Sequence, residues 1–183
     1  MGRRTHANPD APVSTLGEEE SLQLIESLDE DPFLLVLDQV QDPRNLGACL
    51  RSADGAGVNL VVLPSDRSAG LTDVVRHVAC GAAESLNITR VSNLARYLEK
   101  LKNLGLQLIG TSDQSENSLF EASLTGPCAL VMGAEETGIR RLTAKSCDQL
   151  IYIPMKGSIE CLNVSVATGI CLFEARRQRS YQV

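Results

Sequence analysis

The sequence has no tryptophan, and only 3% of its residues are aromatic although 43% are hydrophobic. Its core must therefore be built from Leu, Val, Ile and Ala, which is typical of buried parallel strands covered by helices. A length of 183 residues fits one domain with a sizeable core and is too short for two full domains. We therefore expect one domain of the α/β class.

Long apolar runs are also missing. No stretch of about 18 uninterrupted apolar residues occurs, and the N-terminal segment lacks the apolar run of a secretory signal. We expect a soluble, cytoplasmic protein. The six cysteines are irregularly spaced and form no C-x-x-C pair, so we expect no metal and no disulfide, and five cysteines buried as small hydrophobic residues.

The net charge of -6 argues against a chain that coats nucleic acid by bulk attraction. Residues 1–31 hold eight of the 23 acidic and two of the 17 basic residues, which leaves 15 of each sign from residue 32 onward. Any contact with RNA must then be a local patch. The candidates are Arg140, Arg141, Arg176, Arg177 and Arg179. The last three are equally explained as a solvated helix end that the helix dipole favours.

Two regions differ in pattern. Residues 1–31 are predicted to be a flexible acidic tail or linker remnant in which a short helix can form at 21–28, and residues 32–183 are predicted to be the folded domain. We expect strands at 33–40, 59–65, 106–112, 128–133 and 150–155, a weaker strand at 86–91, and helices at 45–56, 71–80, 93–104, 139–147 and 163–178. This alternation predicts a mostly parallel sheet with helices on both faces.

Ligands of such sheets bind beyond the carboxyl ends of the strands, where loops enter helices. Three loops of this kind are unusual: DPRNLGACLRSA at 42–53, VMGAEETGI at 131–139 and IPMKGSIECLN at 153–163. In the first loop, Asn45 can cap the helix, and Arg51 lies about two turns further along. Its guanidinium can grip a phosphate through two hydrogen bonds, although a capped helix with a solvated arginine is the simpler interpretation.

The second and third loops carry weaker signals when each is taken alone. Gly133 lets the backbone approach a ligand closely, but a plain glycine-rich turn explains that loop about as well. It is not a phosphate loop, because Ile139 and Arg140 stand where Lys and Ser or Thr are needed, and the absence of G-x-G-x-x-G leaves a nicotinamide enzyme with little support. In the third loop, Asn163 is a good cap for a helix whose run of small and apolar residues predicts burial.

The three loops taken in order resemble the motifs of one enzyme family. The patterns D-P-x-N-x-G-x-x-x-R-x-A, L-V-M-G-x-E-x-x-G and I-P-M-x-G-x-x-x-x-L-N-V-S-V-A are similar to the three motifs of the SpoU branch of the SPOUT RNA methyltransferases. The match spans about Phe33 to Arg179. Within the branch, DRSAGL, VACGAAESL and SNLAR resemble segments of bacterial enzymes that methylate a guanosine ribose in 23S ribosomal RNA.

The resemblance implies transfer of a methyl group from S-adenosylmethionine to a ribose 2′-hydroxyl of RNA. It also implies a C-terminal trefoil knot and a homodimer whose active site is completed across the interface, with no membrane partner. The implied catalytic positions are Asn45, Arg51, Glu135 and Asn163, and the implied cofactor-binding positions are Gly133, Ile153 and Leu162. A free guanidinium stays protonated, so we expect Arg51 to hold the phosphate of the target nucleotide.

Two features depart from the family pattern. Cys161 stands where related enzymes usually have Ser, so a thiol replaces a stronger hydroxyl donor. The ribosomal enzymes also carry a small N-terminal RNA-binding domain without a counterpart in this sequence, so we expect either a fragment or a different mode of substrate selection. Two alternatives remain open, a transfer-RNA ribose methyltransferase, which shares all three motifs, and an inactive RNA-binding module of the same fold.

Overall fold

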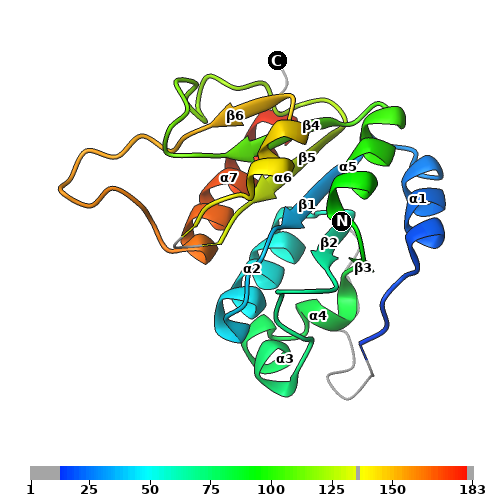
Figure 1. The fold of residues 1–183 in the computed structure, drawn as a ribbon. Coiled ribbons are helices and arrows are strands. Elements are labelled where there is room, and N and C mark those ends of the chain that lie inside the picture. Colours follow the sequence, from blue (N-terminus) through cyan, green and yellow to red (C-terminus); the bar gives the residue numbers. More distant parts are fainter. Residues whose placement is uncertain (1–12, 135–136, 181–183) are drawn as a thin grey trace.

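The computed structural model describes residues 13–134 and 137–180. At its centre lies a parallel sheet of six strands in the order β3-β2-β1-β5-β4-β6 (Figure 1). The strands are β1 Phe33–Leu37, β2 Leu60–Pro64, β3 Ile88–Val91, β4 Gln107–Thr111, β5 Cys128–Met132 and β6 Gln149–Ile151. The six predicted strands and the α/β class are confirmed, although β1 ends at Leu37 rather than at 40 and β6 at Ile151 rather than at 155. Every strand pair in this sheet is parallel.

The helices follow the predicted alternation with one addition. They are α1 Glu18–Glu26, α2 Pro43–Ala56, α3 Asp73–Ala79, α4 Ala82–Ser85, α5 Leu94–Asn103, α6 Arg141–Ser146 and α7 Val164–Ser180. The pattern did not predict α4, because its four residues are too short for a helical period and follow Gly81, which has a positive φ of 90°. No helix in these described ranges is both long and apolar enough to cross a membrane.

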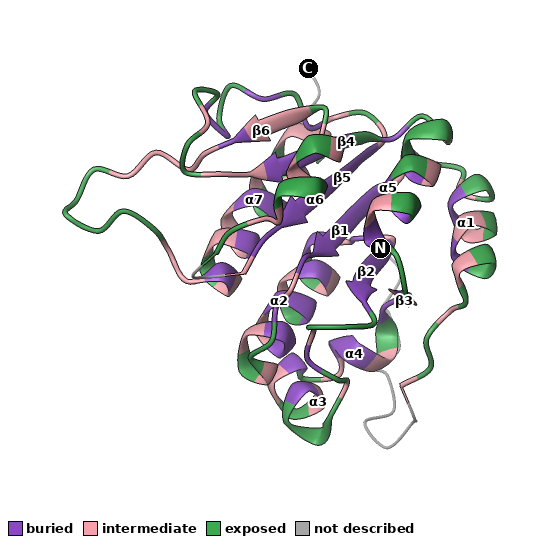
Figure 2. Ribbon diagram, viewed as in Figure 1, coloured by how far each residue is buried: buried purple, intermediate pink, exposed green. Residues whose placement is uncertain are grey.

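Helices cover both faces of the sheet. Side chains of β1 alternate, so Leu35 and Leu37 belong to one apolar cluster and Leu34 and Val36 to the other. The first cluster contains buried residues of α2, α3, α4 and α7, and the second those of α1 and α5. The strands β1, β2 and β5 are accordingly buried throughout, whereas β6 at the edge of the sheet is mostly half-buried, and the helices turn an exposed side outward (Figure 2).

Part of the acidic segment ahead of residue 32 packs on the sheet. Leu16 forms a bridge with Thr89 of β3, and α1 places Ser21 and Ile25 one turn apart against the second cluster. The Ser21 hydroxyl donates to the Glu18 carbonyl at 2.6 Å, so the buried hydroxyl of Tyr97 is the donor in its 2.6 Å contact with Ser21 Oγ. Residues 16–26 of the expected flexible tail are thus held by both apolar and polar contacts.

The cysteines differ from the expectation that five are buried. All six are free; Cys49, Cys128 and Cys171 are buried and Cys147 is half-buried, but Cys80 and Cys161 are exposed. Cys80 is exposed because it ends α3 in a left-handed conformation, with a φ of 52°. Burial raises the pKa of Cys49 to about 11 and that of Cys171 to about 12, so both thiols are neutral at pH 7.

Tyr97→Phe should lower the free energy of unfolding by about 1 kcal/mol, because it removes the hydrogen bond that anchors α1 while keeping the buried ring. Urea denaturation measures the change. A double-mutant cycle with Ser21→Ala should return a coupling energy of roughly 0.5–1 kcal/mol. A coupling energy of zero would show that α1 does not pack here in solution.

Candidate active site

The candidate site lies where β1 and β5 end side by side. The two strands pair in parallel up to Leu37 and Met132, so Asp38 and Gly133 are the first residues beyond them. The chain leaves β1 through α2, which packs on one face of the sheet, and leaves β5 toward α6, whose flanking residues pack on the other. Oppositely directed connections from neighbouring strands create the crevice in which open α/β sheets bind ligands.

The first motif loop enters α2 through an Asp cap. Oδ1 of Asp42 accepts the main-chain N–H groups of Arg44 at 2.7 Å and Asn45 at 2.9 Å, and Pro43 occupies the first helical turn. The prediction that Asn45 caps this helix is therefore wrong, since Asp42 takes that role three residues earlier. The Asn45 side chain is instead used in a contact with the third loop.

That contact joins two segments far apart in the sequence. Nδ2 of Asn163 donates to Oδ1 of Asn45 at 3.1 Å. Oδ1 of Asn163 accepts the main-chain N–H of Ser165 at 3.0 Å and its hydroxyl at 2.6 Å, which confirms Asn163 as the cap of α7. One side chain thus starts α7 and holds the first loop.

The third loop extends away from the domain between its two anchored ends (Figure 1). Its residues 156–161 are exposed, whereas Ile153 and Leu162, at either end, are half-buried. Ile153 packs against the first apolar cluster. The predicted cofactor contacts are therefore the parts of this loop that lie nearest the body of the domain, and exposed Cys161 directly precedes Leu162.

The second loop is a tight turn with main chain packed on main chain. Gly133 is buried, and a Cβ at this position would collide with the main chain of Gly138 and Ile139. Ala134 and Gly138 exchange two main-chain hydrogen bonds of 3.1 and 2.8 Å, and Gly138 has a positive φ of 63°. Glu135, the predicted catalytic residue of this loop, lies outside the described residues.

An ion pair between a buried carboxylate and a partly exposed guanidinium closes the second loop, and sequence reasoning did not identify it. Asp38 is fully buried, and its carboxylate accepts Nε of Arg140 at 2.8 Å, Nη2 at 2.7 Å and the main-chain N–H at 3.1 Å. The available signal was a charged residue directly after a continuous apolar strand. Arg140, predicted as part of an RNA patch, thus has a structural partner.

Arg51 lies apart from the Asn45–Asn163 contact within one chain. It is six residues beyond Asn45, which places it about 9 Å further along α2 and roughly 240° around the helix. Its guanidinium is exposed, and Nη1 donates to Sγ of Cys80 at 3.4 Å. The structure therefore brings Asn45 and Asn163 together but directs Arg51 toward the end of α3.

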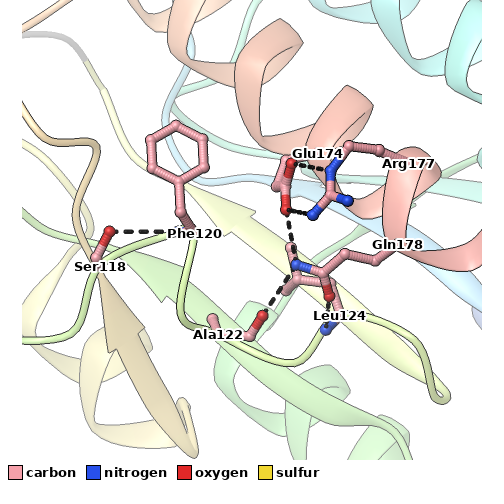
Figure 3. A network of polar contacts seen from close by, with 7 residues as sticks. All are labelled: Ser118, Phe120, Ala122, Leu124, Glu174, Arg177 and Gln178. Atoms are coloured by element: carbon pink, nitrogen blue, oxygen red, sulfur yellow. Dashed lines mark hydrogen bonds and ion pairs between the residues drawn. The ribbon is translucent and has the colours of Figure 1, made fainter.

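The arginines near the end of α7 mostly hold the chain itself. Arg177 makes two hydrogen bonds to Glu174, and the Gln178 amide donates to Ala122 and accepts from Leu124 (Figure 3). Arg176 donates to the carbonyls of residues 56 and 57, and Arg179 to those of residues 31, 32, 124 and 126. These contacts favour a structural role over the expected RNA patch, whereas Arg141 is exposed at the start of α6.

Two cavities lie at the opposite edge of the sheet, beside the amino end of β1. Their volumes are about 180 and 500 Å³, and both are lined by Glu30, Asn59 and Arg176. Neither contains a predicted catalytic or cofactor-binding residue, although Arg176 and Arg179 were candidates for contact with RNA. Acidic side chains line both, and the Arg176 guanidinium is already bound to main-chain carbonyls, so the crevice at β1 and β5 is the better candidate for an anionic substrate.

Comparisons with known proteins show which family this chain belongs to. The model of the SpoU rRNA methylase family matches residues 32–173, which include all three loops. The chain belongs to this family. A 23S rRNA (guanosine-2'-O-)-methyltransferase RlmB from Photorhabdus laumondii is 61% identical over 151 residues, which are 82% of this chain and 62% of that protein. The chain thus spans less than two thirds of that relative's length.

Solved structures of SpoU proteins share the fold. The SpoU methyltransferase AviRb from Streptomyces viridochromogenes, in complex with AdoMet, has a TM-score of 0.78 and 27% identity, covering 84% of this chain and 63% of that one. A TrmH/SpoU tRNA modifying enzyme from A. aeolicus has a TM-score of 0.75 and 31% identity, covering 89% and 84%. The SpoU family therefore includes proteins described as acting on different RNAs.

Gly133→Ala should lower the free energy of unfolding by roughly 1–3 kcal/mol, because the added methyl group meets main chain rather than a movable side chain. Gly126→Ala is the matched control, since a Cβ there meets nothing within 4 Å. Thermal and urea denaturation compare the two variants. Equal stability of both would contradict the tight packing of the second loop.

Proposed function

We propose that this chain transfers a methyl group from S-adenosylmethionine to the 2′-hydroxyl of a guanosine ribose in 23S ribosomal RNA, through the domain formed by residues 32–183. The observation that carries the proposal is the Asn163–Asn45 hydrogen bond of 3.1 Å, which joins the first and third motif loops. Membership of the SpoU family and the activity named for the Photorhabdus laumondii relative support it.

The described residues fit S-adenosylmethionine as a ligand. Gly133 leaves bare main chain at the end of β5, where no side chain can stand. We assign to the same ligand the main chain of Ile153 and Leu162, which are half-buried at the two ends of the third loop. When bound, the cofactor supplies a methyl group on a sulfonium, which is reactive without a metal. The AviRb structure, described as a complex with AdoMet, supports this fit.

Methyl transfer requires the 2′-oxygen to approach in line and to lose its proton during attack. We assign Arg51 to the phosphate beside the target ribose, which its planar guanidinium can bind through two hydrogen bonds. That phosphate accepts a hydrogen bond from the 2′-hydroxyl and orients an oxygen lone pair for attack. The phosphate, or Arg51 perturbed by it, would take the hydroxyl proton as the bond from oxygen to the methyl carbon forms and the bond from sulfur to that carbon breaks. Asn163, fixed by Asn45 and Ser165, orients the ribose, and Glu135 is assigned to the same task.

A homodimer completes the proposed site. Arg51 points away from Asn163 of its own chain, so a second copy is needed to bring the two residues together. The exposed side of α7 carries Val166 and Phe173, which are 50% and 53% exposed and two helical turns apart. The Phe173 ring lies over Gly55 of α2, so this apolar surface adjoins the helix that carries Arg51.

The path of the chain supports a C-terminal trefoil knot. The segment between β4 and β5 runs along the end of β6, where Leu119 donates to the Tyr152 carbonyl and Tyr152 to that of Asn117, at 2.8 and 2.9 Å. The same segment then packs against α7 through Gln178 (Figure 3). The connection thus passes both elements of the C-terminal part, as a threaded arrangement requires.

Transfer RNA is the second candidate substrate. The A. aeolicus neighbour is described as a tRNA modifying enzyme, and this chain covers 84% of its length. Incubation with S-adenosylmethionine and either ribosomal or transfer RNA, followed by mapping of ribose methylation, separates the two. Methylation of a 23S guanosine alone supports the proposal; methylation of transfer RNA alone selects the alternative, and none with either RNA would contradict both.

Arg51→Lys should lower kcat/KM for the RNA by about tenfold or more, because Lys keeps the charge but loses a charge-assisted hydrogen bond worth roughly 1.5–3 kcal/mol. Initial rates with labelled S-adenosylmethionine measure the effect. Arg96→Lys is the control, since Arg96 is exposed on α5 beside Glu18. Undiminished activity of Arg51→Lys would exclude a two-bond phosphate grip.

Val166→Asp combined with Phe173→Asp should convert a dimer to monomers and abolish methyl transfer, because two charges would be buried in the apolar contact. Analytical ultracentrifugation measures the mass, and Val74→Asp, at a residue 47% exposed on α3, is the matched control.

Mixing inactive Arg51→Ala and Asn163→Ala subunits should restore about a quarter of the sites, since half of the dimers are mixed and each has one intact site. A wild-type monomer, or no restoration on mixing, would contradict a shared site.

A further inference from the structure

Asp38 is bonded to both ends of the second motif loop. Its main-chain N–H donates to the Met132 carbonyl at 2.7 Å, immediately before Gly133. Its carboxylate accepts the main-chain N–H and the guanidinium of Arg140, immediately after Ile139. Asp38 therefore holds the two residues that flank this loop, Met132 and Arg140, although Asp38 itself lies in the connection that follows β1.

The bonds between Asp38 and Arg140 allow only one arrangement of the two residues. A fully buried carboxylate is costly unless it is paired and hydrogen-bonded. Oδ1 of Asp38 takes the side edge of the Arg140 guanidinium through Nε and Nη2, while Oδ2 takes the main-chain N–H. Because one carboxylate binds both the side chain and the backbone of Arg140, a shift of that backbone would break the whole set of bonds.

The position of Arg140 also determines the surroundings of Gly133. Its interior is held by the paired hydrogen bonds of Ala134 and Gly138, and the main chain of Gly138 and Ile139 fills the space beside Gly133. A displacement of Arg140 therefore moves residues in direct contact with Gly133. Since Gly133 is where the main chain meets the proposed cofactor, the position of that surface depends on Asp38.

We propose that Asp38 is a positioning residue for the methyl transfer. Through Arg140, Gly138 and Ile139 it sets the place of Gly133 at the crevice between β1 and β5, and thereby the affinity for S-adenosylmethionine. This inference rests on the proposed function. It assigns to Asp38 no contact with substrate or cofactor.

The test compares stability with cofactor affinity in four variants. Asp38→Asn removes one charge, and Arg140→Met leaves a buried carboxylate without its cation. Their combination removes both charges, so it should recover part of the stability that Arg140→Met loses. Arg140→Lys retains the cation without the guanidinium fork. Calorimetric titration with S-adenosylmethionine gives Kd, and urea denaturation gives the free energy of unfolding.

We expect Kd to rise by about tenfold or more in Asp38→Asn, in Arg140→Met and in the double variant, since small displacements remote from the reacting atoms have effects of this size. Arg140→Lys should give a smaller rise. The double variant decides between the two roles, because its Kd stays high although its stability recovers. A Kd that recovers together with stability would reduce Asp38 to a structural role and overturn the inference.

Glu84→Gln is the matched control. It breaks a second ion pair with a buried carboxylate, in which Nε of Arg76 contacts Oε1 of Glu84 at 2.7 Å and the Glu84 side chain is 3% exposed. This pair lies between α3 and α4, so the variant should lose stability while Kd stays within about twofold. An equal loss of affinity in Glu84→Gln would also overturn the inference.

The titration separates the inference from the proposed function. If the wild type does not bind S-adenosylmethionine, the proposed function fails. If the wild type binds and Asp38→Asn binds equally well, only the inference fails.

Discussion

The parallel pairing of β1 with β5 is the contact on which the candidate site depends. Both strands are buried along their whole length, and their register brings Leu37 and Met132 to the same edge. Beyond that edge the chain must diverge, because α2 and α6 lie on opposite faces. Asp38 prevents the two connections from separating freely, and Asn163 attaches the third loop to the first. Three loops from distant parts of the sequence thus share one rigid base.

The fold was largely predictable because local patterns determine it. The strands β1, β2 and β5 are short, almost wholly apolar runs, as expected when helices cover both faces, and the helices α2 and α5 show a clear apolar period. The position of the candidate crevice could also be predicted from residue types. Gly133 directly follows β5, and Asn163 is a capping residue directly before α7. The short helix α4 escaped because four residues carry no period. The predicted cap of α2, Asn45, lies three residues after the observed cap, Asp42. Both residue types are good caps, and spacing alone does not choose between them.

Contacts between distant segments could not be predicted in the same way. Arg176 and Arg179 looked like free cations at a helix end, but their partners are main-chain carbonyls more than 50 residues away. Asp38 looked like an ordinary residue at the end of a strand until Arg140, 102 positions later, was placed beside it. The direction of Arg51 follows from how α2 packs against α3. In each case the deciding fact is tertiary geometry, which a periodicity argument does not contain.

The anchoring of α7 also bears on the order in which the molecule can fold. Cys171, Leu172 and Ala175 complete the same apolar cluster as Phe33 and Leu35 of β1, so the cluster has long sequence separations. Such topologies close slowly, because loop-closure entropy is lost before distant contacts compensate for it. The Asn45–Asn163 contact forms only when α7 has docked. During synthesis on a ribosome, we therefore expect the three loops at the crevice to be joined only after residues up to 175 have emerged.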